Sequence, residues 1–363
     1  MRKTPTGLGL ILAAGLAVVP LSAEAGTKAV VATCGAVLTQ NAYLNRDLSC
    51  SGDALTLKGT VVLDLRGHRL TARGGAAVTF TGAGNPTVTG GAINDSATGL
   101  RAADEESDEP LQSRHVRVVR VGFARNETAL QASGTSSVFG GRTTDVDVID
   151  SHFHRNGDAI AGVFTGPFTV TGSSFTNNRR GVHIDTGSIS VTRSYLGNNT
   201  DEGFGCEEAQ CSLTDSRLEN NPIGVSIRTS PLTLRRTTIT GSVTALSVVV
   251  GFGLAVSDNS FARNTTGVDL TLASATLTKN TFTDNTTGFT AASQEDGFVA
   301  TLVGNRFVHN TDGVYTEEAG VALKDNRAVR NTGWAFYAPN ATDLGGNTQS
   351  STGHRPPCAG VVC

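Results

Sequence analysis

One pattern of apolar and polar positions repeats along most of the chain. An apolar residue is followed three positions later by Asn or Ser, and then by a small residue and a second apolar residue. Eight of the nine intervals between successive copies are 20 to 25 residues long, and a period of this size predicts a solenoid of stacked repeats. The ten apolar landmarks of the pattern are Phe123, Phe153, Phe175, Tyr195, Leu218, Ile239, Phe261, Phe282, Phe307 and Ala328.

Each repeat contains three short stretches in which apolar and polar residues alternate, and such alternation predicts a half-buried strand. The first stretch opens with a small residue, as in Gly181–Ile184, and the second ends five residues before the landmark, as in Phe168–Val170. The landmark itself lies in the third stretch. Hairpin strands would return antiparallel and would not present the same face at the same offset in every repeat. The sequence therefore predicts an all-β coil of parallel strands, right-handed like nearly all crossovers between parallel strands.

The predicted first strands set the number of turns. About 13 turns are expected, with three short strands in each and a rod on the order of 60 Å long. The first strands are expected at Leu55, Val78, Leu100, Leu130, Ile160, Val182, Phe204, Val225, Leu246, Val268, Phe289, Val314 and Trp334.

A polar residue stands two positions before most landmarks, at a bend of the predicted coil. Asn and Ser at bends hydrogen-bond the neighbouring backbone, and Asn tolerates a left-handed conformation. We expect these side chains to stack in register as a ladder with a structural role. The ladder positions are Ser151, Ser173, Ser216, Thr237, Asn259, Asn280, Asn305 and Asn326.

The two ends of the chain carry a family resemblance. The stretch from Cys34 to Cys50 is followed by Leu63–His68, and the chain closes with Asp343–Asn347 before the last two cysteines. Together with the repeats, these features resemble the right-handed parallel β-helix superfamily, which includes pectate lyases, polygalacturonases and many uncharacterised secreted repeat proteins. The resemblance covers the chain from Cys34 to its end and is greatest with the uncharacterised group, where such ends cap the solenoid.

The N-terminus predicts a secretory signal peptide over residues 1–25. It has Arg2 and Lys3, an apolar run from Leu8 to Val19, and a small-x-small stop at Ala25. The rest divides into an N-terminal cap region over 26–54, β-helix repeats over 55–338 and a C-terminal cap segment over 339–363. No stretch reaches the ~20 apolar residues of a membrane span, so we expect a secreted protein, extracellular or periplasmic.

Cysteine content and charge narrow the compartment and the partners. All six cysteines follow the predicted signal peptide, which suits an oxidising compartment and favours pairing between nearest neighbours. Cleavage would leave 27 of the 29 basic and 31 of the 32 acidic side chains, with no basic cluster, so nucleic acid is not an expected partner. The expected disulfides are Cys34–Cys50, Cys206–Cys211 and Cys358–Cys363, the second of them buried across one corner of a turn.

In pectate lyase-like relatives the substrate lies along the first-strand sheet, so the resemblance directs attention to outward residues there. Four ionisable residues gather on three successive turns, namely His183, Asp185, Glu207 and Arg228. His183 is a candidate general base and Arg228 a candidate clamp for a carboxylate, while Asp185 and Glu207 could supply an acid/base pair or cation ligands. The alternative is a salt-bridged column on the surface.

Surfaces that bind sugars usually expose several aromatic rings, and only two face outward on this sheet, which argues against tight carbohydrate binding. Tyr315 and Tyr337 face outward on adjacent turns and, with the outward Asp269, are the candidate substrate-binding residues. Trp334 and Phe336 fall at inward positions and are expected in the core near the C-terminal cap.

Two further groups suggest a metal ion. Insertions lengthen the corner after the first strand over Ala102–His115, Gly134–Asp145 and Ser293–Gly297. The first insertion is acidic and offers the carboxylate oxygens that Ca²⁺ prefers, from Asp104, Glu105, Glu106, Asp108 and Glu109. The alternative is a solvated, mobile loop, because such a run also has the composition of a disordered segment. The second group mixes carboxylates with imidazoles and comprises Asp145, Asp147, Asp150, His152, His154 and Asp158. The metal stays unknown, and no other cofactor is identified.

The sequence does not contain the Asp-Pro-His of mannuronan epimerases, the Gly-His-Gly with paired aspartates of polygalacturonases, or the Trp-Ile-Asp-His of pectate lyases. We therefore expect a protein that engages an extracellular polysaccharide along the first-strand sheet without a catalytic motif. One alternative is a lyase or epimerase acting on uronic-acid polymers through His183, Asp185, Glu207 and Arg228. A second alternative is a structural or adhesive rod.

Overall fold

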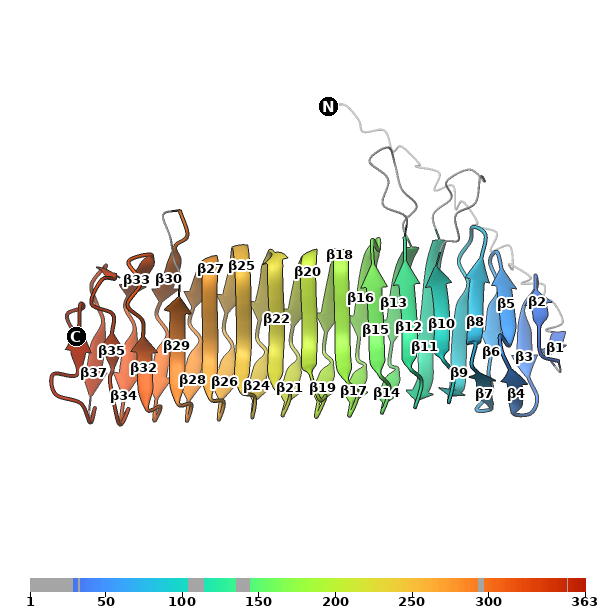
Figure 1. Cartoon of the computed structure of the whole chain (residues 1–363), viewed down its shortest axis with the longest axis horizontal. Coiled ribbons are helices and arrows are strands. Elements are labelled where there is room, and N and C mark those ends of the chain that lie inside the picture. Colours follow the sequence, from blue (N-terminus) through green and yellow to red (C-terminus); the bar gives the residue numbers. More distant parts are fainter. Residues whose placement is uncertain (1–28, 32, 104–113, 135–143, 293–296, 351) are drawn as a thin grey trace, which may run out of the picture.

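The computed structural model describes residues 29–31, 33–103, 114–134, 144–292, 297–350 and 352–363. Within these residues 38 strands wind into a rod of about 14 turns, and every strand pairing is parallel (Figure 1). The predicted all-β parallel coil is thereby confirmed. The predicted signal peptide, the acidic run over 104–109 and most of each corner insertion lie outside the described residues.

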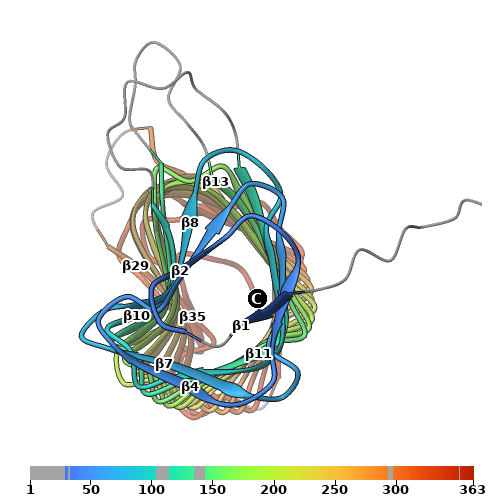
Figure 2. The ribbon, with the colours of Figure 1, turned by 90° about the vertical axis from the view of Figure 1, so that its right-hand side faces the viewer.

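The strands form three columns, each with one strand per turn, and these columns are the sides of the coil when it is viewed along its axis (Figure 2). The first column contains β2 (Ala36–Leu38), β5 (Leu55–Lys58), β8 (Ala76–Thr81), β10 (Thr98–Ala103), β12 (Thr128–Ser133), β15 (Asp158–Val163), β18 (Arg180–Thr192), β20 (Glu202–Thr214), β22 (Ile223–Ser230), β25 (Thr244–Ser257), β27 (Thr266–Thr278), β29 (Thr287–Ala292), β32 (Asp312–Tyr315), β35 (Phe336–Tyr337) and β38 (Cys358–Ala359).

The second and third columns complete each turn. The second contains β1 (Ala29–Val31), β3 (Ala42–Leu44), β6 (Val62–Asp64), β9 (Thr87–Asn94), β11 (Arg114–Ala124), β13 (Thr144–Ile149), β16 (Pro167–Thr171), β23 (Leu232–Arg235), β30 (Ala300–Val303), β33 (Val321–Lys324) and β36 (Thr342–Asp343). The third contains β4 (Leu48–Ser51), β7 (Arg69–Arg73), β14 (His152–His154), β17 (Ser174–Thr176), β19 (Tyr195–Gly197), β21 (Arg217–Glu219), β24 (Thr238–Thr240), β26 (Ser260–Ala262), β28 (Thr281–Thr283), β31 (Arg306–Val308), β34 (Arg327–Val329) and β37 (Thr348–Ser350). Strands β18, β20, β25 and β27 run on from the first column into the second, and β9 and β11 from the second into the third.

Inward side chains of equivalent position stack into files that fill the coil. Val182, Val225 and Val268 lie in one such file of the first column and are fully buried. In the third column the landmark phenylalanines stack face to face, as Phe282 and Phe307 do with 4.7 Å between ring centroids. Every turn thus adds its apolar side chains to one continuous core.

The landmark register is wrong by one residue in one turn. Leu196, not Tyr195, pairs with Phe175 and Leu218 and is fully buried. Tyr195 points outward, and its hydroxyl donates a 2.9 Å hydrogen bond to Glu219. Both residues are apolar enough to fit the repeat, and the phenolic hydroxyl decides between them because it needs a hydrogen-bond acceptor.

The small residue that opens each first strand has a steric cause. A Cβ on Gly288 would lie 2.5 Å from the backbone carbonyl oxygen of Gly313 on the next turn. Successive turns approach each other closely at this corner, so the sequence keeps glycine or alanine there.

The predicted polar ladder is present. The amide group of Asn280 donates to the Val256 carbonyl oxygen at 2.9 Å and to Oδ1 of Asn305 at 3.0 Å, and its own Oδ1 accepts from the Asn259 backbone and side chain. The left-handed residue at this bend is the one before each ladder residue, such as Lys279 at φ 54°, and not the Asn itself. Buried backbone groups at the bend are therefore satisfied by side chains from the neighbouring turns.

The Asn residues that the repeat places three positions after the landmarks form a second ladder, which sequence analysis did not predict. It repeats the same bonding, for example from the Asn285 side chain to Phe261 and Asn310. Its members are Asn126, Asn156, Asn178, Asn199 and Asn221, and then Asn264, Asn285, Asn310 and Asn331.

The last turns differ from the prediction in register. Val314 pairs with Phe336, so the first strand of that turn begins two residues after Trp334. Phe336 is buried as expected, but Trp334 is partly exposed and stacks on His354 with 3.6 Å between ring centroids. The Trp334 backbone N–H donates to Asp312 Oδ1 at 2.7 Å, which holds this residue outside the strand.

Candidate functional site

The outer face of the first column carries the predicted site residues in two parallel files. We call one the central file, and its register runs Ala161, His183, Gly205, Ser226, Ser247, Asp269, Thr290, Tyr315 and Tyr337. We call the other the corner file, and it runs Val163, Asp185, Glu207, Arg228, Val249 and Thr271. Between His183 and Tyr315 the central file holds only short side chains, four of them glycine, serine or threonine and one a carboxylic acid.

His183 does not join the other three ionisable residues of the predicted cluster. Its Nδ1 lies 2.6 Å from Oε1 of Glu202, a residue that sequence analysis did not select. Glu202 is 7% exposed, and a Cβ on Gly205 would lie 2.6 Å from His183 Nδ1. The absence of a side chain at Gly205 therefore leaves the space that the pair occupies. A carboxylate bound to one imidazole nitrogen fixes the ring and leaves Nε2 on the other side of it.

A second buried carboxylate lies beside this pair. Asp158, on the turn before, accepts hydrogen bonds from Nε and Nη2 of Arg180 at 2.9 and 2.7 Å, and from Arg179. Burial favours the neutral acid, but the hydrogen bonds and charges of the two arginines outweigh it and lower the pKa of Asp158. Arg180 also lies in the electric field of Glu202. Asp158, Arg179, Arg180 and Glu202 thus form one charged network over three successive turns.

The sequence contains a signal for this network. Asp158, Arg180 and Glu202 occupy one register position, immediately before the small residue of the first strand. Other turns carry Thr98, Thr128, Thr244, Thr266 and Thr287 there. Asp158, Arg180 and Glu202 are ionisable residues on three successive turns at a position where several other turns have threonine. This substitution marks the network in the sequence.

The corner file holds the remaining predicted residues on adjacent turns. Asp185, Glu207 and Arg228 are paired in register, and Arg228 Nε lies 3.9 Å from Glu207 Oε1. The Arg228 side chain is 62% exposed, and Asp185 accepts a hydrogen bond only from its neighbour Thr186 at 3.2 Å among the described residues. A solvent-exposed pair at this distance contributes little to stability. Arg228 and Asp185 are therefore available to a ligand.

Asp269 lies in the middle of the central file with its side chain half-buried. No hydrogen bond or ion pair reaches its carboxyl group from the described parts of the chain. Burial raises the pKa of Asp269 because the charged form loses water without gaining a cation. The carboxyl group can therefore bond a hydroxyl group presented from outside.

Four rings gather where the central file ends. Tyr315 and Tyr337 stack with 4.7 Å between centroids, and Trp334 packs against Tyr337 at 5.0 Å and against His354. The Tyr337 hydroxyl donates to Glu317 at 3.3 Å, and burial together with that carboxylate raises the pKa of Tyr337. We call Tyr315, Tyr337, Trp334 and His354 the aromatic cluster. Tyr315 is 41% exposed and follows the short Thr290, which leaves one side of its ring uncovered.

The second predicted cluster is divided among the three faces. Asp147 lies on the second column and accepts a 2.8 Å hydrogen bond from His115, while burial raises the pKa of the neighbouring Asp145. His152 and His154 lie on the third column and hydrogen-bond Ser174 and Thr176, and Asp150 lies at the bend before them. Asp158 lies on the first column. The described residues contain no group of three His, Cys, Asp or Glu side chains that could hold a metal ion.

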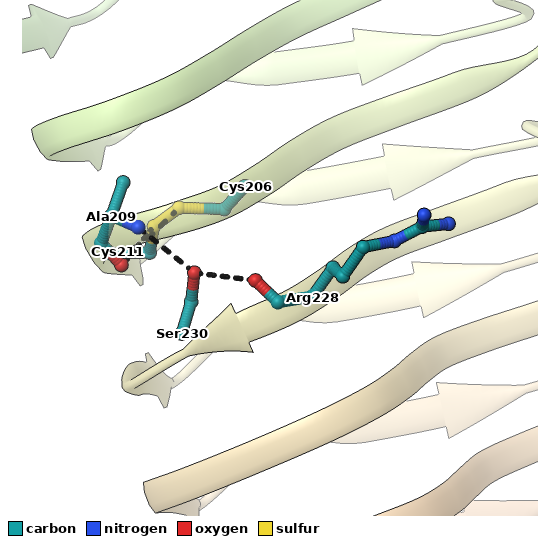
Figure 3. The surroundings of a disulfide bond; sticks show 5 residues. All are labelled: Cys206, Ala209, Cys211, Arg228 and Ser230. Carbon is teal, nitrogen blue, oxygen red and sulfur yellow. Dashed lines mark hydrogen bonds between the residues drawn. A yellow bond between two sulfur atoms is a disulfide. The ribbon is translucent and has the colours of Figure 1, made fainter. Parts of the chain in front are cut away.

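Three disulfides join the cysteine pairs that the sequence predicted, Cys34–Cys50, Cys206–Cys211 and Cys358–Cys363. Cys206 and Cys211 are both buried and close the corner that carries Glu207 (Figure 3). On the next turn the Ser230 hydroxyl accepts from the Ala209 N–H at 3.0 Å and donates to the Arg228 carbonyl oxygen at 2.8 Å. The corner between the first and second columns is therefore fixed beneath Glu207 and Arg228.

Comparison with known proteins addresses the fold. A family model described as "Right handed beta helix region" matches residues 205–349. A double mutant of the periplasmic alginate epimerase AlgG is 12% identical over 85% of this chain and 77% of that chain, with a TM-score of 0.45. The Agl-KA catalytic domain is 11% identical over 91% and 62%, with a TM-score of 0.41. An alginate lyase from Paenibacillus sp. str. FPU-7 is 14% identical over 85% and 99%, with a TM-score of 0.32.

No curated protein sequence matches the chain. Among the residues that the structure describes, no helix is long and apolar enough to cross a membrane. The three columns of parallel strands give the chain the right-handed parallel β-helix fold, and the matched family model describes this fold over residues 205–349.

Proposed function

We propose that the outer face of the first column binds an extracellular polysaccharide, which lies across successive turns along the central file. The observation that carries the proposal is the aromatic cluster at the end of a file of short hydroxyl side chains. Stacked rings of this size are normally buried for their apolar area, yet Tyr315 stays 41% exposed. Sugar rings present apolar C–H faces that pack on such rings.

The spacing of the turns suits a polymer. Parallel strands of adjacent turns lie ~4.8 Å apart, which is close to the length of one pyranose residue in an extended chain. One sugar per turn would pass Ser226, Ser247, Asp269 and Thr290 before it reached Tyr315. Their hydroxyl and carboxyl groups can exchange hydrogen bonds with sugar hydroxyls along the whole path.

The proposal also places the protein outside the cytoplasm. Its three disulfides form and persist in oxidising compartments, and its sequence begins with the features of a secretory signal peptide. The protein would then share a compartment with extracellular or periplasmic polysaccharides.

Affinity electrophoresis tests this function, with gels that contain hydroxyethyl cellulose, galactomannan, starch, pectate or alginate. We expect at least one polymer to retard the wild-type chain. Tyr315→Ala and Trp334→Ala should each weaken that retardation about two- to twelvefold, the effect of losing about 0.5 to 1.5 kcal/mol of ring contact. Tyr195→Ala on the third column is the matched control and should leave retardation unchanged. Equal retardation of all variants would show that the aromatic cluster does not bind the polymer. If no polymer retards the wild-type chain, a structural or adhesive rod is favoured.

A second function is favoured by one observation, the bond between Glu202 and His183. An imidazole fixed by a buried carboxylate is the arrangement of a general base, so we also consider lyase or epimerase activity on uronic-acid polymers, with Asp185, Glu207 or Arg228 contacting the substrate. Formation of unsaturated uronate, followed by its ultraviolet absorbance, and proton exchange into deuterated polymer would detect the two reactions. His183→Ala should abolish either one while polymer retardation persists, and activity that survives this change would exclude His183 as the base.

A further inference from the structure

A separate depression lies on the outer face of the second column, around the corner from the central file. It has a volume of about 360 Å³ and crosses four turns, from β16 through β18 and β20 to β23. Its floor contains Thr169, Ser190, Ser212 and Thr233, which follow one another in register, and its rim includes Gln210. None of the candidate residues discussed above lines it except Cys211, whose side chain is turned into the core.

The depression exists because the middle of this file is shorter than its ends. Serine lacks the γ-methyl group of threonine, and Ser190 and Ser212 are half-buried while Thr169 and Thr233 on the outer turns are exposed. Pro167 and Pro231 raise the rim at the two ends with rigid rings. The sizes of the side chains on four successive turns therefore produce the depression.

The chemistry of the lining restricts the ligand. Among the residues that the structure describes, no charged side chain lines the depression, so a polyanion or a cation would lose water there without a counter-charge. Hydroxyl and amide groups alternate with the apolar rings of the prolines and the methyl groups of the threonines. A volume of this size lies within the range of about 300 to 1,000 Å³ for small-molecule sites.

The polar groups of the floor are available to a ligand. The side chains of Ser190, Ser212 and Thr233 make no hydrogen bond with any described group. At one end the Thr169 hydroxyl donates to Asp147, which His115 also binds. The Thr169 oxygen therefore presents fixed acceptor lone pairs at the end of the hollow, while the free hydroxyls beside it can donate or accept.

We propose that this depression is a second carbohydrate site, which binds a short neutral oligosaccharide independently of the central file. Four turns span ~14 Å at ~4.8 Å per step, the length of a few sugar rings. The rings lie against the apolar rim while their hydroxyls bond the serine and threonine floor. A disulfide-fixed corner separates the two sites, so one protein offers two faces to polysaccharide.

Isothermal titration calorimetry with cellotetraose, mannotetraose, maltotetraose and tetragalacturonate tests the proposal. We expect one of the three neutral tetrasaccharides to bind, and amide chemical shifts of Ser190, Ser212 and Thr233 to change on binding. Ser212→Arg fills the hollow and should weaken that binding more than tenfold. Thr276→Arg places the same side chain two turns beyond Thr233 in the same file, outside the depression, and should leave binding unchanged.

A second variant keeps the test decisive if Ser212→Arg folds poorly. The double variant Ser190→Ala, Ser212→Ala removes two hydroxyls without adding bulk and should weaken binding at least threefold. Tyr315→Ala should leave this binding intact, which separates the depression from the function proposed for the central file. The inference is overturned if no neutral tetrasaccharide binds, if tetragalacturonate binds more tightly at the same amides, or if binding depends on Tyr315 and not on the serines.

Discussion

The imidazole of His183 and the carboxylate of Glu202 meet above Gly205, with 2.6 Å between Nδ1 and Oε1. The two residues belong to adjacent turns, and the intervening glycine belongs to the same strand as Glu202. The pair thus depends on three positions of the sequence: the imidazole of His183, the carboxylate of Glu202, and a glycine at position 205.

Gly205→Ala should separate this pair, because the new methyl group would lie 2.6 Å from His183 Nδ1. The expected cost is about 1 to 3 kcal/mol of unfolding free energy, the usual effect of overpacking. The ¹⁵N shifts of the His183 ring should move toward those of a ring without a carboxylate neighbour. Ser226→Ala on the following turn of the same file is the control. Unchanged His183 shifts in Gly205→Ala would mean that the glycine does not shape the pair.

Asp158 should make the protein sensitive to acid. Its pKa is lowered in the folded state, since the hydrogen bonds and charges of Arg180 and Arg179 outweigh burial. The stabilisation is therefore complete above its ordinary value of 3.8 and is lost as the pH falls through the lowered folded-state pKa. At pH 7, Asp158→Asn should lower the unfolding free energy by about 2 kcal/mol, because the partly buried Arg180 and the exposed Arg179 lose their shared buried carboxylate partner.

Thermal melts of wild type and Asp158→Asn from neutral to acid pH measure this difference. The two melting temperatures should converge at the acid end, where both side chains are neutral. A constant gap across the series would assign the loss to packing and not to charge.

The files of the coil could be predicted from the sequence because each inward position repeats with a fixed period. Alternation alone predicts that Val182, Val225 and Val268 point inward at equivalent positions, and in the structure they lie in one buried file. The predicted register is wrong where two nearby apolar residues could both fill the inward position. Leu196 fills it in place of Tyr195, and Phe336 fills it in place of Trp334. Alternation cannot separate them, since the deciding contacts, with Glu219 and with Asp312, come from other turns.

The candidate site was predicted less completely for a related reason. The chemistry of His183 marks it in the sequence, but its partner Glu202 lies three residues before Gly205, the outward residue of the next turn. Contacts between turns join residues about 20 positions apart, so a polar pair is visible only once the register is known to one residue. The depression over Ser190 and Ser212 depends on the size of side chains on a face that no motif marked.

The asparagine ladder should be a principal source of stability. Asn280 is buried and bonds both neighbouring turns. It donates to Asn305 on the following turn and to the Val256 carbonyl oxygen on the preceding turn, from which Asn259 in turn donates to it. Asn280→Ala leaves several buried groups without a partner, each worth about 1 to 3 kcal/mol, so a loss of about 3 kcal/mol is expected. Chemical denaturation measures it, with the exposed Thr276→Ala as the control. A loss below 1 kcal/mol would show that water replaces the ladder bonds.

The corner disulfide should matter less than its burial suggests. Cys206 and Cys211 close a short loop, for which chain entropy gives about 2 kcal/mol. The double variant Cys206→Ala, Cys211→Ala should lose about that amount and keep its polysaccharide binding, because the Ala209 and Ser230 hydrogen bond still fixes the corner. Adding Ser230→Ala should cost a further 1 to 2 kcal/mol. Binding that disappears with the disulfide alone would contradict this order of importance.

Asp269 should act on stability in the opposite direction from Asp158. Burial raises its folded-state pKa, so the folded chain holds a proton that the unfolded chain releases above the ordinary value of 3.8. Stability therefore falls as the pH rises from that value through the raised folded-state pKa, and the full penalty remains at neutral pH. Asp269→Asn removes the charge and should stabilise the protein at pH 7, on the order of 0.5 kcal/mol because the group is half-exposed, but not at pH 3.

Melting temperatures of wild type and Asp269→Asn across this pH range give the sign directly. The difference should be absent in acid and grow toward neutral pH, whereas Ser247→Ala on the preceding turn should give a difference that does not vary with pH. A variant less stable than wild type at pH 7 would mean that the carboxylate has a favourable partner in the folded protein. In that case Asp269 would no longer be free to receive a sugar hydroxyl in the central file.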